Sequence, residues 1–210
     1  MFPGLSKAVS QGRENQRKTI ENYIEILLVI ALPLSIGLLF IGKDLLTFLY
    51  NPNFAQGNLA LRIIAVSLIF LPFNHSLSFL LVANGFEIVN LRQVAINTAL
   101  GGLAGVVLVS QYDLLGAAIM VFLMSFIGFS QYTYFTYALL FSLNLWRIMR
   151  RPLIISIFML AVFVVLEKIN LDFLLTLIIS TCSYIVFISC MSIHALGGIH
   201  IVWGKLVKKG

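Results

Sequence analysis

The stretch FLPFNHSLSFLL, residues 70–81, places a proline, an asparagine and a histidine inside a long apolar run. A proline in a helix interior removes a backbone hydrogen bond, so Pro72 is predicted to bend the helix just before Asn74 and His75. An unpaired amide or imidazole group in hydrocarbon costs several kcal/mol, so these side chains must face protein or water. The stretch therefore indicates either a bent helix held by interhelical hydrogen bonds or a helix that lines a hydrated transport cavity.

The composition of the whole chain places this stretch in a membrane. Of the 210 residues, 60% are hydrophobic and only 10% are charged. A membrane-spanning helix needs about 20 apolar residues. Six blocks reach or approach that length: 22–42, 59–83, 93–110, 114–139, 152–166 and 171–193. The predicted fold is an all-α polytopic membrane protein with about six transmembrane helices.

The distribution of charge predicts the orientation of these spans. The net charge is +6. In a six-span chain only Lys43, Arg62 and Lys168 fall on one side, and the other 11 of the 14 lysines and arginines fall on the opposite side. The positive-inside rule makes that basic side the cytoplasm, so both termini are expected there. Basic loops of this kind are expected to set topology and to touch anionic membrane lipids rather than nucleic acid.

Three regions follow from this topology. Residues 1–21 are expected to form a polar cytoplasmic lead-in, residues 22–193 a six-span transmembrane domain, and residues 194–210 a basic cytoplasmic tail at the interface. The chain is expected to be a multi-pass protein.

The sequence carries no pattern typical of an enzyme or of a cofactor protein. It has no GxxxxGK[ST] phosphate-binding loop, no CxxC pair, and no carboxylate near an expected bilayer midplane. Its two cysteines, Cys182 and Cys190, both fall in the last span and are expected to be packing residues. We therefore expect no catalytic residue, no metal site and no cofactor.

The polar residues inside the spans are the candidates for a substrate path: Arg62, Asn74, His75, Asn97 and Gln131. For Arg62 the alternative is that its side chain extends to the lipid headgroups. A second group is expected to bend or pack helices, and it consists of Pro33, Pro72, Gly101 and Gly105. The two glycines have the GxxxG spacing that lets helix backbones approach closely in lipid.

Several short motifs occur in a characteristic order between residue 1 and about residue 125. They are Phe2-Pro3 with Leu5-Ser6, Leu32-Pro33 with Gly37, Phe54, Leu61-Arg62-Ile63 and Gly116-Ala117-Ala118. In this order and spacing the chain resembles the polysaccharide flippases of the O-antigen and capsule type (Wzx-type), within the multidrug/oligosaccharidyl-lipid/polysaccharide exporter superfamily.

The resemblance implies a function and a larger assembly. Such proteins have 12 to 14 spans in two lobes and move undecaprenyl-diphosphate-linked oligosaccharides across the bacterial inner membrane. It implies that this chain is the C-terminal lobe. The implied partners are a lipid-linked oligosaccharide, membrane lipids, and either a missing N-terminal lobe or a second copy of the chain. The alternatives are a drug or metabolite antiporter of the same superfamily and a truncated fragment without function of its own.

Overall fold

The computed structural model describes residues 12–169 and 173–195. The chain divides into two compact units, Met1–Ile154 and Ile155–Gly210, which we describe separately. Every described element is helical, which confirms the all-α prediction. The elements are α2 (Arg13–Leu49), the short 3₁₀ helix η1 (Pro52–Gly57), α3 (Asn58–Ser67), α4 (Leu71–Ala83), α5 (Glu87–Leu139), α6 (Leu145–Ile169) and α7 (Phe173–Ala195).

Long apolar helices make this a membrane protein by length and composition. Among the described residues four helical stretches are long and apolar enough to cross a bilayer: Arg13–Leu49, Pro52–Ala83, Glu87–Leu139 and Leu145–Leu166. A shorter apolar helix covers Leu175–Val186. Most of the predicted polar lead-in up to residue 11, and the basic tail from residue 196, lie outside the described residues.

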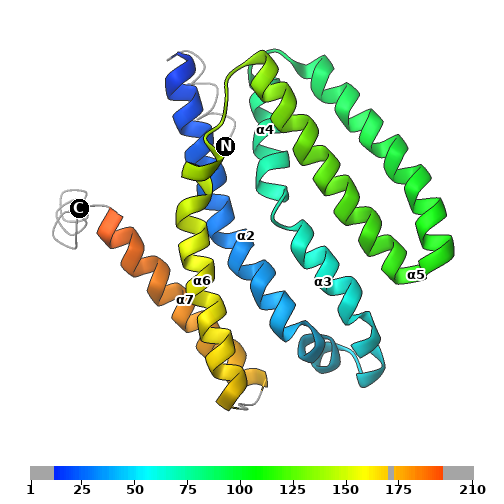
Figure 1. Ribbon diagram of the computed structural model, residues 1–210, viewed down its shortest axis with the longest axis vertical. Helices are drawn as coiled ribbons and strands as arrows, with labels where there is room; N and C mark the ends of the chain where they lie inside the picture. The colour runs from blue at the N-terminus through cyan, green and yellow to red at the C-terminus, as the bar shows by residue number, and fades with distance from the viewer. Residues whose placement is uncertain (1–11, 170–172, 196–210) are drawn as a thin grey trace, which may run out of the picture. The chain divides into compact units, whose positions relative to one another are not determined.

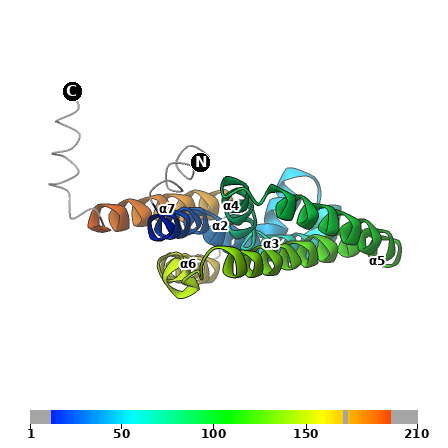
Figure 2. The ribbon, with the colours of Figure 1, turned by 90° about the horizontal axis from the view of Figure 1, so that it is seen from above.

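Helix α5 is a hairpin of two limbs. A straight helix of its 53 residues would be about 80 Å long, whereas the hydrocarbon core of a bilayer is about 30 Å thick. The chain instead reverses at Asp113, whose φ of 47° and ψ of −126° are not helical. Figure 1 shows the two limbs running side by side, and Figure 2 shows the same pairing from above. The two predicted spans 93–110 and 114–139 correspond to these limbs.

Small residues let the limbs of α5 approach closely. A Cβ atom at Gly116 would collide with the backbone carbonyl of Leu108, so only glycine fits next to the turn. Further along, a Cβ at Gly105 would lie 2.9 Å from the sulfur of Met120, and one at Gly101 would lie 3.4 Å from Met124. The GxxxG face of the first limb therefore lies against methionines of the second.

The bend attributed to Pro72 lies one turn earlier than the sequence predicted. The chain leaves the α-helix between α3 and α4, where the backbone amides of residues 68–71 each donate to the carbonyl three residues back. The first of these bonds joins Leu68 to Ala65, and the last joins Leu71 to Leu68. Pro72 itself stands in the first turn of α4. A proline ring clashes with the carbonyl four residues back and disfavours helix at the residue before it, so the break precedes the proline. Asn74 and His75 therefore lie within a regular helix.

Polar contacts join helix α2 to α3, and one of them reaches a carbonyl just before the break. The hydroxyl of Ser35 in α2 donates to the carbonyl of Ala65 at 2.6 Å, and the guanidinium of Arg62 in α3 donates to the carbonyl of Leu39 at 3.1 Å. Backbone groups released by a helix break must be satisfied inside the protein when water is absent. Pro33 lies inside α2, which runs through it as one helix.

The core of the first unit lies between α2, α4 and the second limb of α5. Helix α2 contributes four buried apolar side chains, one at every fourth position, and α4 also contributes four. Phe73 of α4 packs edge-on against Phe129 of α5, with ring centroids 5.0 Å apart. The buried cluster comprises Ile20, Ile24, Leu28, Leu32, Phe73, Leu77, Leu80, Leu81, Tyr132 and Ile148. In the second unit, Ile155, Met159, Phe163 and Leu166 mark one buried face of α6.

Candidate functional site

A line of neutral polar side chains runs between α4 and the two limbs of α5, and we call it the amide seam. The first limb contributes residues at positions 90, 93 and 97, which lie on one face of a helix. Helix α4 and the second limb contribute the facing groups. The seam consists of Asn74, Ser78, Asn90, Gln93, Asn97, Gly128 and Tyr132.

Asn90 organises the end of the seam nearest the start of α5. Its side-chain oxygen accepts hydrogen bonds from the hydroxyl of Ser78 at 2.8 Å and from the hydroxyl of Tyr132 at 3.0 Å. One acceptor therefore joins α4 and both limbs of α5. Interhelical hydrogen bonds of this type stabilise membrane helices by about 0.6 kcal/mol each, and up to about 1.7.

Asn74 and Asn97 both lie against Gly128, about two turns along α5 from Asn90. The amide nitrogen of Asn74 donates to the backbone carbonyl of Ser125 at 3.0 Å. A Cβ atom at Gly128 would lie 3.2 Å from the amide nitrogen of Asn74 and 3.3 Å from that of Asn97. The absence of a side chain at Gly128 thus leaves the space beside which both amides lie.

The seam has unused hydrogen-bonding capacity. The side-chain oxygens of Asn74 and Asn97, and both amide atoms of Gln93, are buried and have no hydrogen-bond partner among the described residues. Such groups are costly in a medium that offers no alternative partner. Water or the hydroxyl groups of a ligand would satisfy them, because each amide can both donate and accept.

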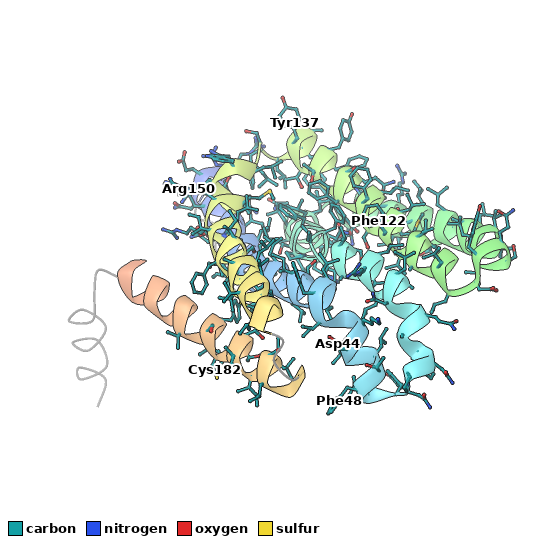
Figure 3. All side chains as sticks on the ribbon, turned by 60° about the horizontal axis from the view of Figure 1, so that its bottom comes forward. Asp44, Phe48, Phe122, Tyr137, Arg150 and Cys182 are labelled. Atoms are coloured by element: carbon teal, nitrogen blue, oxygen red, sulfur yellow. The ribbon has the colours of Figure 1, made fainter. Side chains whose placement is uncertain are left out.

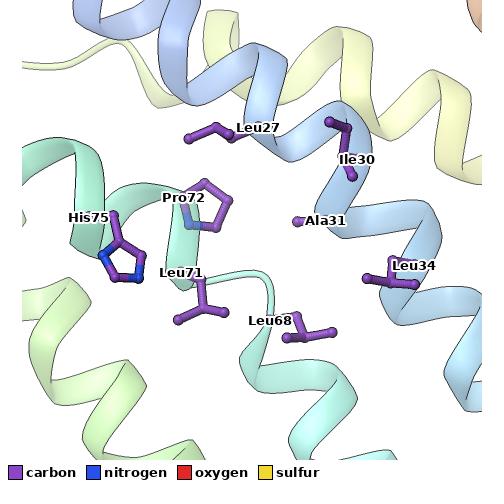
Figure 4. A pocket seen from close by; sticks show the side chains of 8 residues that line it. All are labelled: Leu27, Ile30, Ala31, Leu34, Leu68, Leu71, Pro72 and His75. Carbon is purple, nitrogen blue, oxygen red and sulfur yellow. The ribbon is translucent and has the colours of Figure 1, made fainter. Parts of the chain in front are cut away.

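The structure separates His75 from the seam. His75 is exposed on a different face of α4, at the edge of an apolar groove of about 240 Å³. Figure 4 shows its imidazole beside Pro72 and Leu71, across from side chains of α2. The groove is lined by Leu27, Ile30, Ala31, Leu34, Leu68, Leu71, Pro72 and His75.

Arg62 also lies away from the seam, whereas Gln131 stands three residues after Gly128, on the same side of the second limb. Arg62 is exposed and its guanidinium binds the carbonyl of Leu39, so it links α3 to α2. Gln131 precedes Tyr132 in the second limb, and its buried side-chain oxygen has no partner among the described residues. Of the five predicted path residues, Asn74 and Asn97 both lie against Gly128.

A second polar cluster, absent from the sequence-based site, links α2 to the start of α6. Glu21 is 1% exposed, and its carboxylate accepts from the backbone amide of Asn144 at 3.0 Å. Arg147 and Arg17 lie 3.5 and 3.6 Å from the same carboxylate. One turn further, Glu25 pairs with Arg151 at 3.2 Å.

The signal for this charge ladder was present in the sequence. Glu21 and Glu25 are four apart on α2, and Arg147 and Arg151 are four apart on α6, so each pair occupies one helix face. Matching the two faces, however, requires knowing that α2 and α6 are neighbours. The ladder is a structural link, because its carboxylates already have cationic partners.

The seam can recognise a polar ligand but has no group suited to proton transfer. Its members are amides, hydroxyls and a glycine, all neutral near pH 7. Within residues 12–169 and 173–195, no group of three or more His, Cys, Asp or Glu side chains is placed to hold a metal ion. Comparison of the chain with protein-family models and with curated proteins gave no match.

Proposed function

We propose that this chain is the C-terminal lobe of a flippase of the bacterial inner membrane that moves undecaprenyl-diphosphate-linked oligosaccharides. In this proposal it has six spans, both termini in the cytoplasm, and works with an N-terminal lobe or a second copy. The order of the sequence motifs between residues 1 and 125 supports the family. The observation that carries the function is the amide seam.

A sugar ligand fits the chemistry of the seam. Oligosaccharides present many hydroxyl groups, each of which donates and accepts, and amide side chains do the same. The unpartnered oxygens of Asn74 and Asn97 would accept from such hydroxyls. A hydrated seam also lowers the free-energy cost of moving a polar group through the hydrocarbon region. The ligand gives up hydrogen bonds to water but gains hydrogen bonds to amides, which lipid chains could not supply.

The proposal is tested by replacing the seam amides in cells that depend on this gene. Asn74→Leu and Asn97→Leu should each lower export about fivefold, since one hydrogen bond contributes about 1 kcal/mol. The measurement is the fraction of lipid-linked oligosaccharide in spheroplasts that a membrane-impermeant sugar-oxidising reagent can reach. Protein abundance in the membrane is measured in parallel.

Asn53→Leu is the matched control, because it makes the same chemical change at an exposed residue of η1. It should leave export unchanged. Normal export by both seam variants would refute the assignment of the sugar path to the seam. A gene deletion that leaves export unchanged but raises sensitivity to drugs would refute the flippase function itself.

A further inference from the structure

The first turns of α6 present two different faces, and only one of them is used by the charge ladder. Arg147 and Arg151 pair with the carboxylates of α2. Trp146 and Arg150 each precede one of these arginines, so they lie about 100° around the helix. Trp146 is 73% exposed, and Arg150 is exposed as well. The outward face thus pairs an indole with a guanidinium one turn away.

The charges at this end of the first unit do not cancel. Helices α2 and α6 contribute six cations, and α2 contributes three acids, which leaves a net charge of +3 there. Lys18 pairs with Glu14 at 3.2 Å, and the other two acids belong to the ladder. No carboxylate of the described residues lies within 4.0 Å of the guanidinium of Arg150. The cations are Arg13, Arg17, Lys18, Arg147, Arg150 and Arg151, and the acids are Glu14, Glu21 and Glu25.

Exposed aromatic side chains occur at the same end of the first unit as Arg150 (Figure 3). Tyr137, near the end of α5, is 70% exposed. Figure 3 shows Tyr137 and Arg150 at one end of the first unit, away from Asp44 and Phe48. Tryptophan and tyrosine concentrate at the membrane–water interface. One turn beyond Arg150, Ile154 is 45% exposed and apolar, so the same face changes from interfacial to hydrocarbon character.

We propose that Trp146 and Arg150 form a binding site for the headgroup of an anionic membrane phospholipid. The guanidinium of Arg150 binds the headgroup phosphate, Trp146 lies beside the polar part of the headgroup one turn nearer the start of α6, and the acyl chains lie along Ile154. Arginine suits this role because its planar donors match the phosphate oxygens. The positive end of the α6 dipole adds to the attraction. This inference is independent of the transported substrate.

Fluorescence quenching tests the site on the full chain in vesicles. The chain has two tryptophans, so Trp203→Phe leaves Trp146 as the only one. Vesicles contain about one part phosphatidylglycerol to four parts phosphatidylcholine. A nitroxide label on the headgroup, which quenches tryptophan on contact, is carried either by all the phosphatidylglycerol or by an equal amount of phosphatidylcholine. One cation near the surface gives about a fivefold preference for an anionic lipid over a zwitterionic one. Since the anionic lipid is outnumbered about four to one, about half of the lipids beside Trp146 should be anionic.

Quenching by headgroup-labelled phosphatidylglycerol should therefore exceed quenching by headgroup-labelled phosphatidylcholine more than twofold. Arg150→Gln should make the extent of quenching by the two lipids equal. Arg92→Gln, which removes the same charge from an exposed residue of α5, should preserve the difference in quenching. Added inorganic phosphate at constant ionic strength should change neither, because it carries no chain. Equal quenching in the parent protein, no quenching by either lipid, or an undiminished difference in Arg150→Gln would overturn the proposal.

Discussion

Replacement of Glu21 by glutamine should weaken the link between α2 and α6 far more than the same change at Glu25. The substitution keeps the size of the side chain, and its amide oxygen can still accept from the backbone amide of Asn144. It removes the charge that faces Arg17 and Arg147. The glutamine amide group is itself a donor, so it opposes the two guanidinium groups instead of pairing with them.

The expected size of this effect follows from burial. Removing one partner of a fully buried ion pair costs about 3–5 kcal/mol, and an exposed pair contributes about 0.2–1. The side chain of Glu21 is 1% exposed while its partners Arg17 and Arg147 are 36% and 48% exposed. We therefore expect Glu21→Gln to cost about 2 kcal/mol, between those limits. Glu25 is 14% exposed and pairs with a single arginine that is 60% exposed, so Glu25→Gln should cost less than about 1 kcal/mol.

The assay is reversible unfolding of the purified protein in mixed micelles with increasing SDS mole fraction, followed by circular dichroism. A difference of about 2 kcal/mol corresponds to about a thirtyfold change in the ratio of folded to unfolded protein. Arg147→Gln combined with Glu21→Gln should cost less than the sum of the single changes, since both remove the same contact. Equal costs at positions 21 and 25, or strict additivity of the pair, would refute the reasoning.

Two further predictions concern glycines and use the same assay. Gly128→Ala should lower stability by about 1–3 kcal/mol through overpacking, because the new methyl group presses on the amides of Asn74 and Asn97. Gly102→Ala should leave stability unchanged, because a methyl group there meets nothing within 4 Å. Equal effects of the two substitutions would contradict the tight approach at Gly128. Gly116→Ala should lower the yield of folded protein sharply, because its Cβ meets the backbone of Leu108 rather than a movable side chain, and wild-type yield on gel filtration would show that the hairpin does not close as described.

Much of the fold follows from residue patterns that act locally. Apolar blocks of membrane length predict helices, since a segment in hydrocarbon must satisfy its own backbone hydrogen bonds. The reversal near Asp113 was expected from the gap between the predicted spans 93–110 and 114–139. Pro72 correctly indicated a break in the second apolar block, although the break precedes the proline because the ring clashes toward the N-terminal side.

The site was predicted only in part. Asn74 and Asn97 stand out because amides are rare within apolar runs, and both belong to the seam. Asn90 and Tyr132 gave no such signal, because one lies in a short loop sequence and the other in an aromatic stretch typical of an interface. His75 follows Asn74 directly, yet its side chain points about 100° away around α4 and reaches an apolar groove instead.

The sequence by itself determined what each segment is. It specified the apolar helices, the break near Pro72, the close-packing glycines and the net positive charge, because these depend on hydrophobicity, backbone geometry and charge within one segment. The tertiary structure alone decided which segments meet. Asn74 and Asn97 lie beside one another's helices only where Gly128 of a third helical segment has no side chain, and Glu21 pairs with Arg147 only because α2 lies beside the first turns of α6. Contacts between residues far apart in the chain depend on how helix faces pack together, and no single segment records that arrangement.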